Sequence, residues 1–222
     1  AARRNHDKVM EADFTDALEK IVLGTERQVM MSPEDKRRTA YHEGGHAIVG
    51  MLTDGADPVR KISIIPRGQS LGVTFSAPDA DRYNYSEQEL RARIKVALGG
   101  RAAEEVVFGD LTTGAESDIQ QLTLIARQMV GRWGMSRAIG PIAVLPVDGV
   151  GPLLPGVAET SEATQRLVDE EVRRIVETAH QEVSELLRSH RSNLDALASA
   201  LLERETLDEA AAYAAAGLSR DS

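Results

Sequence analysis

Cysteine is absent from this 222-residue sequence. Its absence excludes disulfide bridges, thiolate metal ligands and cysteine nucleophiles, and it fits a reducing compartment. Any bound metal must therefore be held by His, Asp or Glu. Aromatic residues are also scarce, at 4% of the chain, so the composition gives no indication of which side chains a ligand would present.

Long apolar runs and clustered positive charge are missing as well. No run of about 18 apolar residues and no leader pattern occur, so the sequence predicts a soluble piece without a membrane span. The net charge of −9 is spread over several expected helices, which argues against nucleic acid as a partner. Because the chain begins with Ala1-Ala2-Arg3-Arg4, we expect it to be part of a longer protein. No Walker A pattern occurs, so this piece is not expected to bind ATP that way.

Apolar residues recur at helical spacing through most of the chain. Ser32, Ser86 and Ser161 stand where helix N-caps are expected, and Pro33 occupies a first helical position. Thr206 and Glu209 have the spacing of a capping box. The expected helices cover residues 14–22, 33–54, 86–100, 102–107, 119–133, 161–186 and 194–202, with a last helix after this capping box.

Two short alternating stretches give the only well-defined prediction of β-structure. They contain Ile62 with Ile64 and Val73 with Phe75, and the turn residues 66–68 separate them. Residues 140–156 are rich in Pro and Gly and predict an irregular connection with at most one strand.

The residues His42-Glu43-Gly44-Gly45-His46 match the pattern HExxH inside an expected helix. Residues four apart on an α-helix differ by about 40° in direction and about 6 Å in height, so both imidazoles can face one ion. Zinc lowers the pKa of a bound water to about 7, and a neighbouring carboxylate takes its proton during attack on a carbonyl. The pattern predicts peptide-bond hydrolysis at zinc, with His42 and His46 as ligands and Glu43 as general base.

The two glycines inside this pattern strengthen the prediction. Each glycine in a helix interior costs up to about 1 kcal/mol relative to alanine, so we expect Gly44 and Gly45 to permit close approach of another backbone or of a substrate. The competing explanation is a chance match on a solvated helix face, expected in about one chain in a hundred of this length. The fold class predicted is mainly α with a small β-sheet, with a zincin-type HExxH active-site helix and a C-terminal helical bundle.

Residue types and spacing alone do not identify the third metal ligand. A catalytic zinc site normally has three protein ligands and one position for water. The metzincin pattern is excluded, because Val49 and Leu52 stand where its glycine and histidine would be. Asp118 is attractive because the start of a helix favours an ionised carboxylate, although acidic residues are common there without a metal. The candidates are His6, His180, His190, Glu104, Glu105, Asp110, Glu116 and Asp118.

Several segments are more specific together than HExxH alone. They are TAYHEGGHA at 39–47, SIIPRG at 63–68, LGVT at 71–74, GGRAAEE at 99–105 and TTGAESDI at 112–119. In this order they resemble the peptidase domain of the FtsH family, the membrane-anchored AAA ATP-dependent zinc proteases. Gly44 stands where an alanine is more usual in that family, and Ser117 where an asparagine is common.

The resemblance implies that Asp118 is the third ligand of one Zn²⁺ per chain. It also implies that residues 1–24 end the helical lid of a preceding AAA ATPase module, that 25–216 form the zinc metallopeptidase domain, and that 217–222 are a C-terminal tail. Family members form homo-hexamers whose ATPase module uses ATP to thread unfolded protein substrates into the peptidase chamber. The full-length protein would be membrane-anchored, with the peptidase on the cytoplasmic or equivalent organellar side.

Two other functions are compatible with the residues. One is a zinc exopeptidase or other zinc hydrolase, and the other is a non-catalytic hexamer-forming scaffold with a vestigial metal site. An intact Glu43 argues against the scaffold, because a structural zinc needs no base. As a further hypothesis, the edge of the strand at Gly72, Val73, Thr74 and Phe75 binds an extended substrate through backbone hydrogen bonds.

Overall fold

The computed structural model describes residues 29–68, 70–145 and 160–220, together with Met10 and Arg27. The helix expected at 14–22 and most of the irregular connection expected at 140–156 lie outside these residues. The described part is mainly helical and has one small sheet, which confirms the predicted fold class. Its helices are α2 (Pro33–Leu52), α3 (Glu87–Phe108), the short 3-10 helix η2 (Thr113–Ala115), α4 (Glu116–Gly131), α5 (Glu162–Ser189), α6 (Arg191–Arg204) and α7 (Glu209–Ala216).

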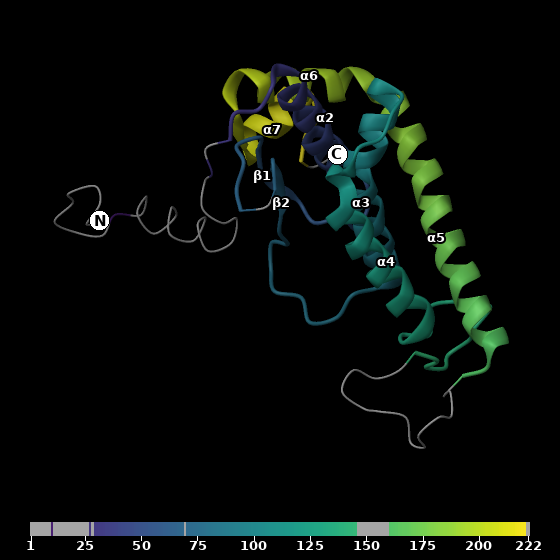
Figure 1. Ribbon diagram of the computed structural model, residues 1–222. Coiled ribbons are helices and arrows are strands. Elements are labelled where there is room, and N and C mark those ends of the chain that lie inside the picture. The colour runs from purple at the N-terminus through teal and green to yellow at the C-terminus, as the bar shows by residue number, and fades with distance from the viewer. Residues whose placement is uncertain (1–9, 11–26, 28, 69, 146–159, 221–222) are drawn as a thin grey trace.

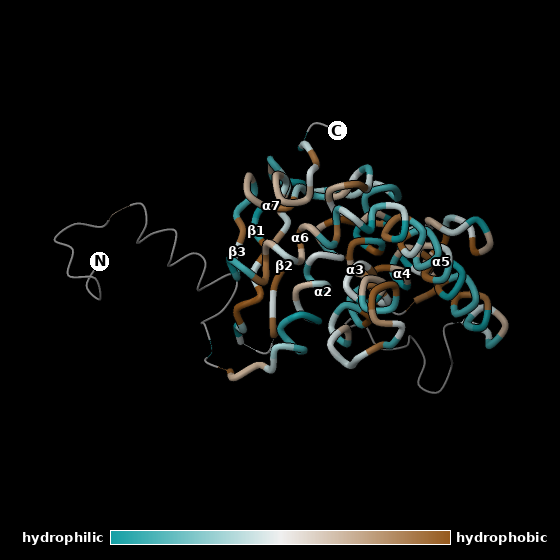
Figure 2. Tube along the Cα trace, turned by 90° about the horizontal axis from the view of Figure 1, so that it is seen from above, coloured by the Kyte–Doolittle hydropathy of each residue, from teal (hydrophilic) through white to brown (hydrophobic). Residues whose placement is uncertain are grey.

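Helix α2 lies at the centre of the fold. Figure 2 shows it between the strands on one side and α3, α4 and α5 on the other. In Figure 1, the long α5 runs beside α3 and α4, away from the sheet. Almost every residue of α2 from Thr39 to Gly50 is buried, because this helix is covered from several directions. A helix in this position can hold side chains in fixed orientations.

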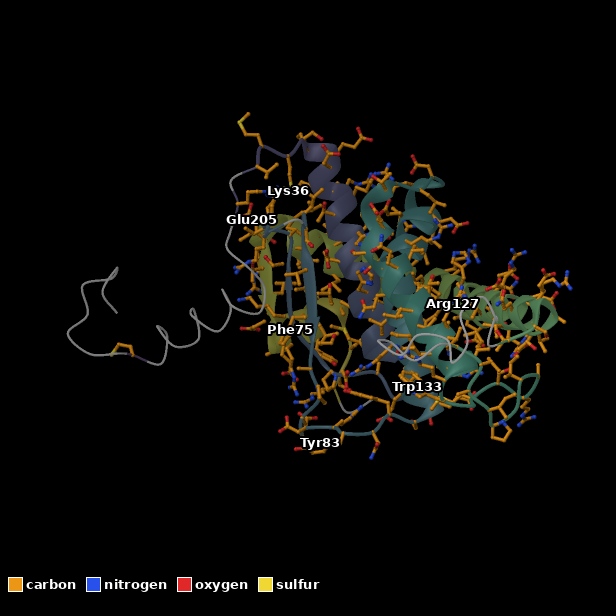
Figure 3. The ribbon with its side chains drawn as sticks, turned by 60° about the horizontal axis from the view of Figure 1, so that its bottom comes forward. Lys36, Phe75, Tyr83, Arg127, Trp133 and Glu205 are labelled. Atoms are coloured by element: carbon orange, nitrogen blue, oxygen red, sulfur yellow. The ribbon has the colours of Figure 1, made fainter. Side chains whose placement is uncertain are left out.

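The start of α2 follows the predicted pattern. Pro33 is its first residue, and the Ser32 hydroxyl accepts a hydrogen bond from the backbone N–H of Asp35 at 3.0 Å. The Lys36 ammonium lies 2.6 Å from the Glu205 carboxylate after α6 (Figure 3), which joins the first turn of α2 to the C-terminal helices.

Helix α3 passes through Gly99 and Gly100 without interruption. The prediction of two helical stretches, one ending at this glycine pair and one over 102–107, is therefore wrong. A Cβ atom added at Gly99 would lie 2.7 Å from the carbonyl oxygen of Gly45 in α2. The glycines mark close helix contact rather than a helix end, and packing between α2 and α3 offsets their low helix propensity.

The sheet has three antiparallel strands in the order β2-β1-β3. The two predicted strands are β1 (Val59–Ser63) and β2 (Val73–Ser76), paired with Ile62 opposite Thr74. The third strand, β3 (Thr206–Asp208), pairs with the other side of β1. Thr206 is therefore no helix cap; Asp208 caps α7 and accepts a hydrogen bond from Ala211 N–H.

The helix predicted over 119–133, with an apolar stripe from Ile119 to Trp133, agrees only in part with α4. Leu122, Ala126 and Met129 are buried, but the helix ends at Gly131 and Trp133 lies beyond it, 46% exposed (Figure 3). Ile119 is 38% exposed as well. The buried part of the stripe still fixes which face of α4 packs against α3 and α5, and so where the first turn of α4 points.

Candidate metal centre

His42 and His46 lie one turn apart on α2, and their rings face the same point. Their Nε2 atoms are 3.1 Å apart, and the ring centroids are separated by 4.8 Å. This is the arrangement that the spacing of four residues predicts for two side chains on one helix face. His46 is buried, and the side chain of His42 is 12% exposed.

Asp118 reaches the same point from the first turn of α4. Its Oδ2 atom lies 3.4 Å from Nε2 of His42 and 3.4 Å from Nε2 of His46. Among the described residues, these three form the one group of His, Asp or Glu side chains with ligand atoms close enough to share an ion. Two segments far apart in sequence, α2 and the first turn of α4, therefore bring the expected ligands together.

The dimensions of this triangle fit zinc. Zinc binds His nitrogen at about 2.0–2.1 Å and carboxylate oxygen at about 2.0–2.2 Å with tetrahedral geometry, which places neighbouring ligand atoms about 3.3 Å apart. The observed separations of 3.1, 3.4 and 3.4 Å lie close to that value. Three protein ligands leave a fourth tetrahedral position for water or substrate.

Hydrogen bonds on the far side of each ring determine which nitrogen carries the proton. Nδ1 of His46 lies 2.7 Å from the carbonyl oxygen of Val96, and Nδ1 of His42 lies 2.8 Å from Oε1 of Glu104. A carbonyl and an ionised carboxylate only accept hydrogen bonds, so each Nδ1 is the donor. When a metal ion replaces the Nε2 proton, the Nδ1–H of each ring is kept and both Nε2 atoms present a lone pair to the triangle.

The charges around the triangle also favour a cation. Burial disfavours a charged ring at His42, but its hydrogen bonds to Asp118 and Glu104 outweigh burial and raise its pKa to about 10. Burial likewise acts against ionisation of Asp118, yet its hydrogen bonds to the two histidines hold its pKa well below the ordinary value. Two carboxylates in contact with the rings thus stabilise positive charge at this position, which a metal ion would also supply.

Glycine residues leave room for the triangle. A Cβ atom at Gly100 would lie 2.5 Å from Nε2 of both histidines, and one at Gly45 would lie 2.3 Å from the carbonyl oxygen of Gly99. The expected close backbone approach at Gly45 is therefore confirmed. At Gly44, an added Cβ would meet only the side chain of Leu194, at 3.2 Å.

Glu43 follows His42 on α2, and its carboxylate faces β2. Its residue is 6% exposed, and its Oε2 atom accepts a hydrogen bond from the Thr74 hydroxyl at 2.7 Å. A Cβ atom at Gly72 would lie 2.7 Å from Oε1 of Glu43. Burial raises the pKa of Glu43, while the nearby histidines and Thr74 act in the opposite direction. The carboxylate is thus enclosed by α2 and by the chain entering β2.

Other candidate ligands are engaged elsewhere in the described part of the chain. Glu104 lies behind His42, on the Nδ1 side of the ring, and not at the triangle. Glu105 pairs with His180 at 3.0 Å, and Asp110 with Arg38 at 2.7 Å. His190 Nδ1 bonds to the Leu186 carbonyl oxygen, and Glu116 accepts from Gln120. His6 lies outside the described residues.

Sequence reasoning missed the supporting residues of this centre. The Val96 carbonyl and Thr112, whose hydroxyl donates to Glu104 at 2.9 Å, have no recognisable motif of their own. The Gly99-Gly100 pair was the one signal that could have indicated the space needed by the histidine rings at Gly100. In the sequence alone, this pair instead predicts a helix end.

Residues 29–214 match the sequence profile of peptidase family M41. The chain belongs to this family. The resemblance to FtsH proteases is confirmed by relatives: this M41 chain is 78% identical over 218 residues to the ATP-dependent zinc metalloprotease FtsH 3 of Conexibacter woesei. It is 55% identical over 212 residues to the ATP-dependent zinc metalloprotease FtsH of Thermobaculum terrenum.

These alignments cover most of this chain but a minor part of each relative. They span 98% and 94% of the M41 chain, against 29% and 33% of the two relatives. The chain thus spans about a third of the length of the curated relatives it matches. Within the described residues, no helix is both long and apolar enough to cross a membrane.

Proposed function

We propose that this chain is the zinc-dependent endopeptidase module of an ATP-dependent protease and that it hydrolyses peptide bonds of unfolded or threaded protein substrates. The observation that carries the proposal is the triangle of His42 Nε2, His46 Nε2 and Asp118 Oδ2, with edges of 3.1–3.4 Å. The two histidines lie on α2, the helix that also bears Glu43. Membership of family M41 and the zinc metalloprotease names of the relatives support it.

The residues have distinct roles in this proposal. His42, His46 and Asp118 would hold one Zn²⁺, which when bound supplies Lewis acidity toward a peptide carbonyl and an attacking water. Glu43 would accept a proton from that water and return it to the leaving amine. Burial of Glu43 and its hydrogen bond from Thr74 keep its carboxylate in one orientation.

The edge strand β2 is proposed to bind the substrate backbone through residues 72–75. Two observations support this substrate-binding role: β2 is at an edge of the sheet, and Gly72 and Thr74 lie against Glu43. An extended peptide paired with this edge would run beside the base. Val73→Pro should weaken cleavage of a short peptide by raising KM, and unchanged cleavage would contradict this role.

The proposal extends to the longer protein. Residues 25–216 would form the peptidase domain, and 1–24 the end of an AAA ATPase lid. The ATPase module would use ATP, and the full-length chain would be a membrane-anchored homo-hexamer with its peptidase on the cytoplasmic or equivalent organellar side. The names of the relatives and the share of their length that this chain leaves uncovered support a further ATPase part.

The first experiment measures metal content and peptide cleavage together. The parent chain, Asp118→Ala and Glu43→Gln are dialysed identically, analysed for zinc, and assayed with a fluorogenic internal peptide. The parent should hold about one zinc and cleave; Glu43→Gln should hold zinc without cleaving, and Asp118→Ala should lose zinc. A zinc-loaded parent that cleaves no peptide would favour the scaffold instead, and a requirement for a free substrate terminus would favour an exopeptidase.

A further inference from the structure

The connection between α3 and α4 delivers Asp118 to the metal centre. Helix α3 ends at Phe108 and is capped by Gly109, which has a left-handed conformation with φ 73°. The turn η2 then begins after Thr112, its N-cap, and runs directly into α4, whose first turn contains Asp118. The position of Asp118 therefore depends on how this turn is held against the rest of the protein.

The Thr112 hydroxyl makes two hydrogen bonds of defined direction. It lies 2.9 Å from Oε2 of Glu104, and the Gly114 N–H points to it at 3.2 Å. The carboxylate only accepts, so the hydroxyl donates its one proton to Glu104 and accepts from Gly114. Thr112 thus fixes the turn through its oxygen and fixes Glu104 through its hydrogen.

Glu104 is the residue that orients His42. Its Oε1 atom accepts from His42 Nδ1 at 2.8 Å, and its side chain is 3% exposed. The second donor to Oε2 is Arg38, at 3.5 Å, and this guanidinium lies closer to Asp110, at 2.7 Å. Thr112 is therefore the nearer donor to Oε2. Loss of its hydroxyl would leave this buried carboxylate oxygen with Arg38 as its distant donor.

We propose that Thr112 is a positioning residue for the metal centre, because its hydroxyl connects the carboxylate that orients His42 with the turn that carries Asp118. This inference rests on the zinc site of the proposed function. Without the hydroxyl, Glu104 can rotate away from His42, and the turn loses its cap at the same time. Two of the three ligands would then be less well oriented for the ion.

The test uses the 222-residue chain and three variants. Thr112→Val keeps the shape but removes the hydroxyl, Thr112→Ser keeps the hydroxyl, and Thr113→Val is the matched control in the same turn. Thr112 and Thr113 are both exposed, so their substitution should not disturb core packing, and circular dichroism of each variant checks that it is folded. In the described part of the chain, the Thr113 side chain makes no hydrogen bond to Glu104. Zinc affinity is measured by competition with a chromogenic chelator, and the cobalt(II) absorption spectrum reports the ligand geometry.

Thr112→Val should bind zinc about tenfold more weakly or worse, since loss of partners behind metal ligands costs about 10–100-fold in affinity. Its cobalt spectrum should shift, whereas Thr112→Ser and Thr113→Val should match the parent. In a double-mutant cycle with Glu104→Gln, the combined loss should be smaller than the sum of the two, because part of the effect of Thr112 passes through Glu104.

Three results would overturn the inference. They are parent-like zinc affinity in Thr112→Val, equal losses in Thr112→Ser or Thr113→Val, and additive losses with Glu104→Gln. A parent chain that does not bind zinc would overturn the proposed function and this inference together. A zinc-binding parent with an unaffected Thr112→Val would remove only the role of Thr112.

Discussion

Replacement of Gly100 by alanine should remove metal binding while leaving the fold in place. Gly100 lies in the interior of α3, where alanine is favoured over glycine by up to about 1 kcal/mol. The new Cβ would lie 2.5 Å from Nε2 of His42 and 2.5 Å from Nε2 of His46. The three atoms nearest to this Cβ all belong to the imidazole rings of the two proposed ligands.

The size of the effect follows from these distances. An ordinary non-bonded contact is about 3.5 Å, so the rings would have to move by about 1 Å. Zinc sites tolerate ligand distances only within about 0.2 Å. Since changes behind the ligands already cost about 10–100-fold in affinity, Gly100→Ala should weaken zinc binding by at least about 100-fold.

The neighbouring glycine provides the contrast. A Cβ at Gly99 would meet the carbonyl oxygen of Gly45 at 2.7 Å and the Cα of His46 at 2.8 Å, which are backbone atoms of α2. Gly99→Ala should therefore lower the melting temperature of the metal-free protein, whereas Gly100→Ala should lower zinc affinity in chelator competition and change that melting temperature little. Parent-like zinc affinity in Gly100→Ala would refute the assignment of the triangle as the metal centre.

Two further predictions concern the base and the start of α3. Thr74→Val should lower kcat for peptide cleavage about tenfold or more, because Glu43 loses the donor that orients it; zinc content and KM should stay close to those of the parent. Thr74→Ser keeps the hydroxyl and should retain most of kcat. A drop in Thr74→Ser equal to that in Thr74→Val would contradict the role of the hydroxyl. Ser86→Ala should lower the free energy of unfolding by about 0.5–2 kcal/mol in urea titrations. The backbone N–H of Ser86 and, to a smaller extent, its hydroxyl lower the pKa of Glu89 from 4.5, so the stability that this carboxylate contributes is present above pH 4.5 and is lost as the pH falls below it. Ser86→Ala keeps the backbone donor and removes the hydroxyl, so it should flatten this part of the pH profile only in part; a profile that becomes flat would contradict the role of the backbone N–H.

The local signals of the sequence were reliable where local chemistry decides the structure. Ser32, Ser86 and Ser161 each cap the helix that they were expected to begin. The spacing of His42 and His46 predicted the convergence of their rings, because both residues belong to one helix. Asp118 could be placed only through resemblance to a family, since its approach depends on the packing of α4 against α3.

The errors came from contacts between distant segments. β3 is a strand because Leu207 pairs with Ile62, about 145 residues away, and nothing near Thr206 indicates that pairing. Gly99 and Gly100 look like a helix end in isolation, but contact with α2 keeps α3 continuous. The contact of Thr112 with Glu104 spans eight residues, but it too depends on how the chain turns after α3.

The contact between Gly45 and Gly99 has a consequence for how the centre could change during evolution. Where two helices meet through backbone atoms, their separation cannot be adjusted by exchanging one side chain for another of different size. The positions of His42 and His46 are therefore fixed by the main-chain geometry of α2 and α3. Adjustment of the metal affinity would have to come from the α3–α4 turn, where exposed residues can be substituted without disturbing the core.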